Sequence, residues 1–170
     1  QIIRDVIARA PDNQYMADMD ATAAWALQHG SDAGRVGVIG FCLGGGYALA
    51  LATGHGYAAA STNYGGCPSD AERALAGACP VVGSYGAKDR SPMGARAAAR
   101  LEAALTALGV DHDIKVYPGA AHGFINDHDP ADATLLLTVL TRVSGTRYHE
   151  PSARDAHRRI AAFFSRHLTS

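Results

Sequence analysis

Three side chains of the types used in nucleophilic catalysis, Cys42, Asp89 and His122, occur in that order along the 170-residue chain. Cys42 lies within Gly40–Gly44 (GFCLG), which is the pattern G-x-S-x-G with Cys in place of Ser. This pattern is typical of a nucleophile at a sharp turn between a buried strand and a helix. The helix dipole favours a thiolate and an oxyanion there. The pattern therefore predicts a nucleophile at Cys42, with the backbone N–H of Leu43 as an oxyanion donor.

The glycines around this turn exclude two other kinds of site. We expect a Cβ atom at Gly40 or Gly44 to collide with neighbouring backbone, because the turn is so tight. A dinucleotide fingerprint needs G-x-G-x-x-G directly after the strand, and that spacing does not occur. A phosphate loop needs Gly-Lys followed by Ser or Thr, whereas Gly45 is followed by Gly46. The plainer alternative is that Cys42 is a small buried apolar residue at a glycine-rich helix start.

Asp89 and His122 each follow a segment with strand character. Asp89 comes shortly after the apolar run Pro80–Tyr85, and His122 comes after the alternating segment Asp113–Tyr117. Functional groups in α/β sheets gather past the carboxyl ends of strands. The order of nucleophile, acid and histidine is also the order expected for this type of turn. We therefore expect His122 to accept the Cys42 proton and Asp89 to orient and stabilise the imidazolium.

Other acidic and histidine side chains fit a catalytic or metal site less well. Asp111 and Asp113 open a strand rather than follow one, and Asp89 alone could be a turn residue, as His122 alone could be a loop histidine. The segment 127–129 (DHD) lacks a second cluster of ligands and is interpreted as a solvated loop. The remaining histidines show no paired ligand spacing: His29, His55, His112, His149, His157 and His167.

The whole sequence alternates apolar runs with longer helical patterns, which predicts a mostly parallel sheet in one α/β domain over residues 1–170. The expected strands are Arg35–Ile39, Ala58–Asn63, Pro80–Tyr85 and Asp113–Tyr117. The expected helices are Ala17–His29, Leu43–Thr53, Ser91–Leu108 and Ala153–Leu168. Ala131–Ser144 also carries apolar residues at helical spacing, so we expect a short helix that packs on the core, with a lid or an oligomer contact as the alternatives.

Composition excludes several classes of protein. The chain is 48% hydrophobic and 18% charged, which is ordinary for a globular domain. Its net charge of -1 gives no electrostatic basis for binding nucleic acid or an anionic membrane. No apolar run approaches the roughly 20 residues of a membrane span. The three cysteines cannot form a closed disulfide framework, which favours a reducing, cytoplasmic location.

These motifs resemble the dienelactone hydrolase family, and the matching segments cover most of the chain. They are 38–45 (VIGFCLGG), Tyr64-Gly65, Gly86-x-x-Asp89, 117–124 (YPGAAHGF) and 148–164. The resemblance implies an α/β-hydrolase-like three-layer sandwich and a triad of Cys42, His122 and Asp89. It also implies the opening of an enol-lactone to a dicarboxylic acid without a metal or organic cofactor. We expect the substrate pocket to be lined by Phe41, Tyr64, Phe124 and Asn126.

Two features depart from the family pattern. Family members carry several strands before the strand that leads to the nucleophile, whereas here that strand already begins at Arg35 and the chain begins at Gln1 rather than Met. We therefore expect an N-terminally truncated domain that lacks the family's second oxyanion donor, its glutamate partner of the nucleophile and a carboxylate-binding arginine. Members also carry an arginine four residues after the catalytic histidine, where this chain has Asn126.

The favoured function is hydrolysis of a lactone or carboxylic ester through an acyl-enzyme. An enolate or alkoxide leaves a thiol adduct more readily than an amine does, so peptides are poorer candidates. One alternative is an inactive fragment or a non-catalytic binding module with a hydrolase-like fold. Another is a thioesterase, acyltransferase or cysteine peptidase on the same fold, which would share the triad and differ in the acceptor. The sequence defines neither the natural substrate nor the oligomeric state.

Overall fold

Four parallel strands form the sheet in a computed structural model that describes residues 14–30, 35–127 and 146–169. Each strand pairs with the next one along the chain, so the order in the sheet is the order in the sequence. The strands are β1 (Gly37–Phe41), β2 (Ala59–Asn63), β3 (Val81–Gly86) and β4 (His112–Tyr117). The expected α/β fold with a parallel sheet is confirmed.

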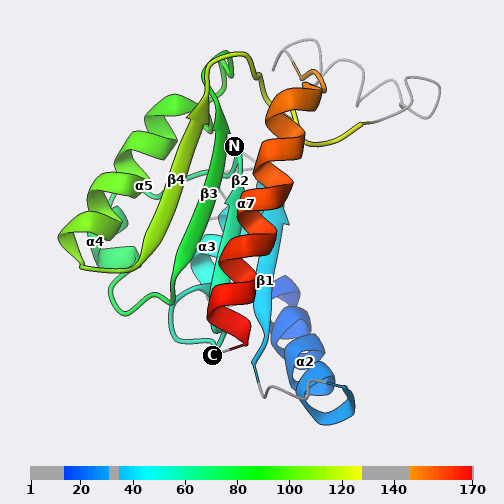
Figure 1. Ribbon diagram of the computed structural model, residues 1–170. Coiled ribbons are helices and arrows are strands. Elements are labelled where there is room, and N and C mark those ends of the chain that lie inside the picture. The colour runs from blue at the N-terminus through cyan, green and yellow to red at the C-terminus, as the bar shows by residue number, and fades with distance from the viewer. Residues whose placement is uncertain (1–13, 31–34, 128–145, 170) are drawn as a thin grey trace.

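Helices cover both faces of this sheet and make three layers (Figure 1). On one face lie α3 (Leu43–Leu51), α4 (Ala71–Ala74) and α5 (Ala95–Ala107), and on the other lies α7 (Glu150–Leu168). The remaining helix, α2 (Gln14–His29), places Met16 in a buried cluster with Tyr47 of α3 and with Tyr57. Because the four strands run in the same direction, their carboxyl ends all lie at one edge of the sheet, and the loops that follow them meet there.

The two faces of the sheet are buried by side chains that alternate along each strand. Val81 of β3 packs with Leu49 and Leu101 on the α3 and α5 side, whereas its neighbour Val82 packs with Ile160 on the α7 side. This is the period of two that a pleated strand imposes. All residues of β2 and β3 are buried. The central strands therefore read as continuous buried runs, as expected for a parallel sheet covered on both sides.

Several helix boundaries differ from the sequence-based expectation. The helix expected from Ser91 begins four residues later, at Ala95; Gly94 before it lies so close to Asp89 that an added Cβ would be 2.5 Å from the Asp89 carbonyl oxygen. The last helix begins at Glu150, before the expected start, with Pro151 in its first turn, a position that suits the fixed φ of proline. The short helix α4 was not predicted. The helix expected over Ala131–Ser144 lies outside the described residues.

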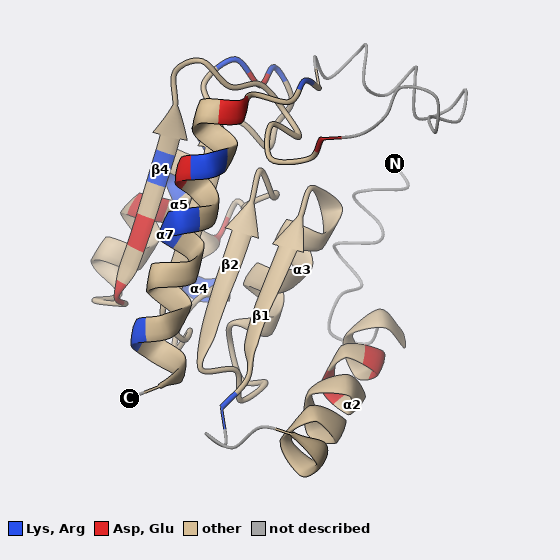
Figure 2. Cartoon of the chain, turned by 45° about the vertical axis from the view of Figure 1, so that its right-hand side comes forward, with Lys and Arg blue, Asp and Glu red and all other residues tan. Residues whose placement is uncertain are grey.

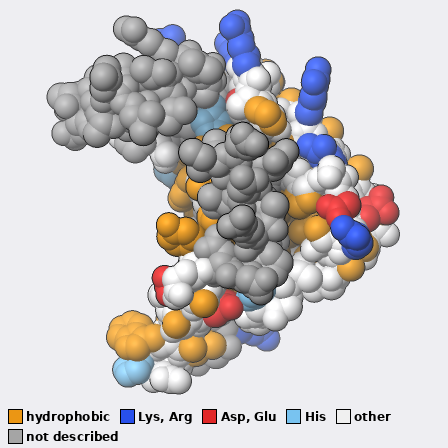
Figure 3. Space-filling model, turned by 180° about the vertical axis from the view of Figure 1, so that it is seen from behind, with side chains coloured by type: hydrophobic (Ala, Val, Ile, Leu, Met, Phe, Trp, Pro, Cys, Tyr) orange, Lys and Arg blue, Asp and Glu red, His pale blue; other side chains and the backbone are white. Residues whose placement is uncertain are grey.

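Charged residues are distributed unevenly over these elements. Figure 2 shows that β1, β2 and β3 carry none, whereas β4 and α7 carry both signs. Seen from behind the view of Figure 1, Figure 3 shows apolar side chains exposed over α2. On this helix Trp25 is 62% exposed and stacks on His29. Within the described part of the chain, no helix combines the length and the apolar character needed to span a membrane.

Two neighbouring glycines of α3, Gly45 and Gly46, differ in how closely they approach the loop after β2. A Cβ added at Gly45 would lie 2.8 Å from the Cα atom of Gly65, whereas one added at Gly46 meets Gly66 only at 3.8 Å. Gly45→Ala should therefore lower the free energy of unfolding by about 2 kcal/mol through overpacking. Gly46→Ala should raise it by about 0.5 kcal/mol, because alanine is the better helix former. Urea denaturation measures both, and equal effects would contradict this packing.

Candidate active site

The backbone at Cys42 has an unusual conformation, with φ of 54° and ψ of -119° between the end of β1 and the start of α3. Positive φ is sparsely populated by residues with a side chain and stores strain of about 1–3 kcal/mol. The turn closes because Gly40 lies against Gly44: a Cβ at Gly40 would be 1.9 Å from the Gly44 carbonyl oxygen. The side chain of Cys42 therefore stands at the apex of a tight strand-to-helix turn.

The expectation for Gly44 is wrong in one respect. A Cβ added at Gly44 meets no atom within 4 Å outside its own helix. The contact is made by the Gly44 backbone against Gly40, so only the earlier glycine is sterically required. The second required glycine of this turn is instead Gly45, because a Cβ there would collide with Gly65 in the loop after β2.

The side chains of Cys42, His122 and Asp89 contact one another in series at the carboxyl edge of the sheet. Nε2 of His122 is 3.2 Å from Sγ of Cys42, and Nδ1 of His122 donates to Oδ2 of Asp89 at 2.7 Å. Cys42 follows β1, Asp89 follows β3 and His122 follows β4. Asp89 and His122 are both buried, at 8% and 6% exposure. A buried imidazole with a partner on each nitrogen is held in one orientation.

Backbone contacts between two loops fix Asp89 beside His122. The N–H of Lys88 donates to the carbonyl of Ala120 at 2.9 Å. A Cβ added at Gly86 would lie 2.6 Å from the carbonyl oxygens of both Ala120 and Ala121, so the loops approach as closely as backbone allows. The second carboxylate oxygen of Asp89 accepts the backbone N–H of Ser91 at 2.8 Å. We did not predict this Ser91 contact, although an Asp followed two residues later by a turn residue is a known signal for it.

The electrostatics of the line favour a thiolate beside an imidazolium. The hydrogen bond with His122 lowers the pKa of Cys42 against the opposing effect of burial, and the N–H of Leu43 contributes in the same direction. Burial lowers the pKa of His122, but hydrogen bonds with Asp89 and Cys42 outweigh it and raise that pKa to about 9. Burial raises the pKa of Asp89, but hydrogen bonds with His122 and Ser91 outweigh it and hold that pKa below its ordinary value. The pKa of the imidazole is thus raised and that of the thiol lowered, which favours a thiolate paired with an imidazolium.

Of the four residues expected to line the pocket, two are fully buried and two are partly exposed. Tyr64 and Phe124 have no exposed surface, and they pack against each other in a buried cluster with Phe41 and Cys42 beside it. The ring of Tyr64 stands edge to face with that of His122, at 5.0 Å between centroids. The ring of Tyr64 therefore supports the imidazole directly, and that of Phe124 supports it through Tyr64; neither ring is exposed as a pocket wall in this structure. Phe41 and Asn126 are partly exposed.

The competing acidic residues are occupied elsewhere. Asp113 pairs with Arg159 of α7, at 2.6 Å between Oδ1 and the guanidinium. Asp111 lies 3.1 Å from His167, near the end of the same helix. Neither carboxylate approaches His122. Over residues 14–30, 35–127 and 146–169, no three His, Cys, Asp or Glu side chains gather as metal ligands.

The chain is similar in sequence to a known protein family. The sequence model described as the dienelactone hydrolase family matches residues 1–168. A protein of Yersinia pestis, named as a proposed carboxymethylenebutenolidase, is 31% identical over all of this chain and 61% of its own length. A protein of Escherichia coli K12 with the same name is 29% identical over 98% of this chain and 59% of its own. The chain thus spans about three fifths of the length of the curated relatives it matches.

Solved structures give the same fold. A crystal structure of a proposed dienelactone hydrolase from Klebsiella pneumoniae superposes with a TM-score of 0.70 at 32% identity. The match covers 89% of this chain and 60% of that one. The carboxylesterase Cest-2923 of Lactobacillus plantarum superposes with a TM-score of 0.64 at 14% identity, over 92% of this chain and 68% of that one. The latter similarity concerns the fold alone.

The paired geometry predicts that Cys42 is the most reactive thiol at neutral pH. Burial raises the pKa of Cys67, and it raises the pKa of Cys79 to about 11, whereas the pKa of Cys42 is lowered. Iodoacetamide should therefore alkylate Cys42 at least about tenfold faster than either of the other two. Peptide mass spectrometry of a time course measures the three rates in one sample.

The pH dependence of this reaction follows from the sign of each shift. A lowered thiol pKa keeps the sulfur charged below the ordinary thiol range, and alkylation slows only when the pH falls through that lowered value. The imidazolium loses its proton as the pH rises through about 9, which removes its stabilisation of the thiolate but leaves the sulfur charged. In His122→Ala the fall in rate should begin at higher pH. Indistinguishable profiles for the two proteins would contradict the pairing.

Proposed function

The chain belongs to the dienelactone hydrolase family, and we propose that it cleaves carboxylic esters or lactones through an acyl-enzyme on Cys42. His122 is the general acid and base, and Asp89 orients it. The observation that carries the proposal is the continuous line from sulfur through imidazole to carboxylate, with separations of 3.2 and 2.7 Å. Family membership supports the hydrolase class, and the triad supplies the chemistry for it.

Acylation begins with the Cys42 thiolate. The sulfur attacks the substrate carbonyl carbon, a C–S bond forms, and the carbonyl electron pair moves onto oxygen. The backbone N–H of Leu43, at the start of α3, helps to lower the pKa of the Cys42 thiol. In the tetrahedral adduct the same N–H stabilises the oxyanion, aided by the positive end of the helix dipole.

The adduct then collapses with help from His122. The C–O bond to the leaving group breaks, and Nε2 of His122 gives its proton to the departing oxygen. In a lactone that oxygen remains tethered to the acyl group, so ring opening yields a thioester with a free enol or alcohol. Asp89 stays ionised and holds Nδ1 throughout, which keeps Nε2 aimed at the reacting atoms.

Hydrolysis of the thioester uses the same groups in reverse. Neutral His122 takes a proton from water, and the oxygen attacks the acyl carbon. The second tetrahedral adduct expels the Cys42 thiolate, leaving a carboxylic acid and an imidazolium. The buried carboxylate of Asp89 stabilises the imidazolium, which gives up its proton in acylation and forms again in deacylation.

The sulfur nucleophile favours particular leaving groups. A tetrahedral thiol adduct expels either its thiolate or the original leaving group, and a thiolate is a far better leaving group than an amine. An alkoxide competes better than an amine, and an enolate of lower basicity competes better still. Lactones, enol-lactones and activated esters are therefore the proposed substrate class, ahead of amides.

Substitution of the nucleophile tests the proposal. Cys42→Ala should lower kcat/KM for an activated ester such as p-nitrophenyl acetate at least about a thousandfold, since the covalent route is removed. Cys67→Ser is the matched control, because this second cysteine is partly buried on the α5 side and should leave the rate unchanged. Equal rates for Cys42→Ala and the parent chain would overturn the mechanism. No hydrolysis by the parent chain would favour a binding module.

The role of the carboxylate has its own expected result. Asp89→Asn keeps the size of the side chain but replaces the acceptor that holds Nδ1–H of His122. The imidazole then loses its preferred tautomer and its compensating charge, so kcat should fall by about two to four orders of magnitude. Steady-state kinetics measure this effect, with circular dichroism to show that the fold is retained. A kcat within twofold of the parent value would exclude Asp89 as the third member.

A further inference from the structure

Tyr117, at the end of β4, makes backbone hydrogen bonds to both the loop that carries Asp89 and the loop that carries His122. Its carbonyl oxygen accepts two backbone hydrogen bonds, from Ala87 at 3.0 Å and from Ala120 at 3.2 Å. Ala87 opens the short loop to Asp89, and Ala120 lies in the loop to His122, two residues before it. One carbonyl group at the end of β4 therefore fixes the start of both segments.

The side chain of Tyr117 reaches the imidazole through a series of ring contacts. Its ring packs on Phe124 with 5.0 Å between centroids, and Phe124 packs on Tyr64 at 5.7 Å. Tyr64 in turn stands against His122 at 5.0 Å. All three aromatic residues are at least 96% buried, since their exposed fractions are 4%, 0% and 0%. Buried rings in contact transmit displacement, because a close-packed interior has no free volume to absorb it.

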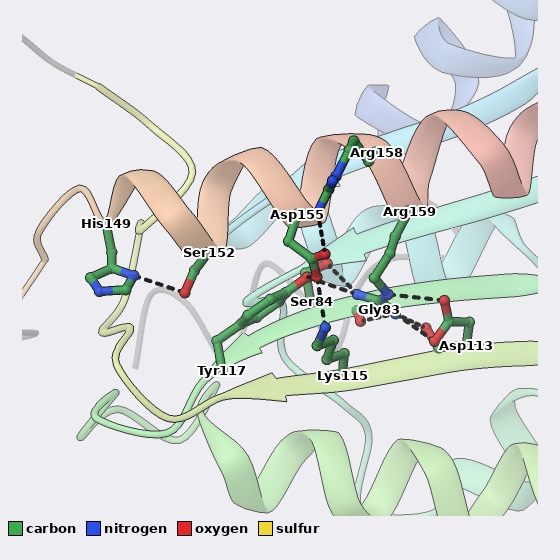
Figure 4. A network of polar contacts seen from close by, with 10 residues as sticks. All are labelled: Gly83, Ser84, Asp113, Lys115, Tyr117, His149, Ser152, Asp155, Arg158 and Arg159. Atoms are coloured by element: carbon green, nitrogen blue, oxygen red, sulfur yellow. Dashed lines mark hydrogen bonds and ion pairs between the residues drawn. The ribbon is translucent and has the colours of Figure 1, made fainter.

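The hydroxyl group of Tyr117 is held by side chains of α7 (Figure 4). It accepts a hydrogen bond from the guanidinium of Arg159 at 3.1 Å and donates one to Asp155 at 3.0 Å. Arg159 also donates to the carboxylate and carbonyl of Asp113 on β4, and Lys115 pairs with Asp155 at 2.7 Å. The phenol thus has its donor and one acceptor site filled by charged partners, which makes strong hydrogen bonds.

We propose that Tyr117 is a positioning residue for the triad, which sets the orientation of His122 from α7 through its hydroxyl group and its ring. The inference rests on the proposed function, in which His122 must face Cys42. It assigns a role to a side chain that makes no contact with the reacting atoms. On α7, Asp155 accepts the hydrogen bond of the hydroxyl and Arg159 donates one to it.

The test compares two tyrosine-to-phenylalanine variants. Tyr117→Phe keeps the ring and removes the hydroxyl group. Tyr57→Phe is the matched control, because Tyr57 is also buried and its hydroxyl also makes a hydrogen bond, to the carbonyl of Met19 at 3.1 Å, but it lies in the α2 and α3 cluster. Asp155→Asn provides a second variant that keeps the phenol and weakens its acceptor. Thermal unfolding of all three monitors loss of stability.

The deciding readout is the pH profile of Cys42 alkylation, which a purely structural role would not move. With the phenol released, the imidazole holds the sulfur less well, so the lower limb of the profile should move to higher pH in Tyr117→Phe. The alkylation rate at neutral pH should fall about fivefold, as expected for a weakened hydrogen bond. Asp155→Asn should shift the limb in the same direction by less, and Tyr57→Phe should match the parent protein.

Each outcome separates this inference from the proposed function. If the profile of Tyr117→Phe coincides with those of Tyr57→Phe and the parent, Tyr117 has no positioning role, whatever the ester activity. If the parent chain hydrolyses no ester, the proposed function fails, while a shifted profile in Tyr117→Phe still assigns the positioning role toward the Cys42–His122 pair. A loss of kcat in Tyr117→Phe without any change in the profile also overturns the inference.

Discussion

The conformation of Cys42 is the constraint on which the rest of the site depends. A residue with a side chain is held at a φ of 54°, which it adopts only when its surroundings leave no alternative. Those surroundings come from β2. The N–H of Cys42 donates to the carbonyl of Asn63 at 3.0 Å, and the Asn63 amide donates to the carbonyl of Gly40 at 3.1 Å. The buried Asn63 thus ties both sides of the turn, and Gly40 provides the space for it to close.

Parallel topology then brings the other groups to that sulfur. The loops after β1, β3 and β4 leave the same edge of the sheet. Residues far apart in sequence therefore converge there, each within a few residues of the end of its strand. Burial has two effects there. It opposes charge on each of Cys42, Asp89 and His122, and it strengthens the hydrogen bonds that restore that charge. The hydrogen bonds outweigh burial at all three groups, and the balance favours a thiolate at the partly buried Cys42.

Sequence alone predicted the parallel sheet, because buried strands and amphipathic helices have different periods and both were clear. It also identified Cys42, Asp89 and His122, which the structure brings together, since each follows a strand in the order that a triad requires. It could not place Tyr64 and Phe124, because an aromatic residue beside a catalytic loop can face either the substrate or the imidazole. Nor could it find the link from Tyr117 to Asp155, which joins a strand to a helix far along the chain. Such contacts depend on how α7 crosses the sheet, and no local pattern encodes that.

In the proposed mechanism, the sulfur of Cys42 carries the acyl group between the two half-reactions. The most direct test is to mix the protein with an activated ester, quench in acid within the first turnover, and locate the added mass by peptide mass spectrometry. We expect one acyl group per chain, attached to the peptide that contains Cys42 and lost again when the reaction proceeds to completion. Hydrolysis with the acyl group found on another residue, or with no acylated species at any time, would contradict it.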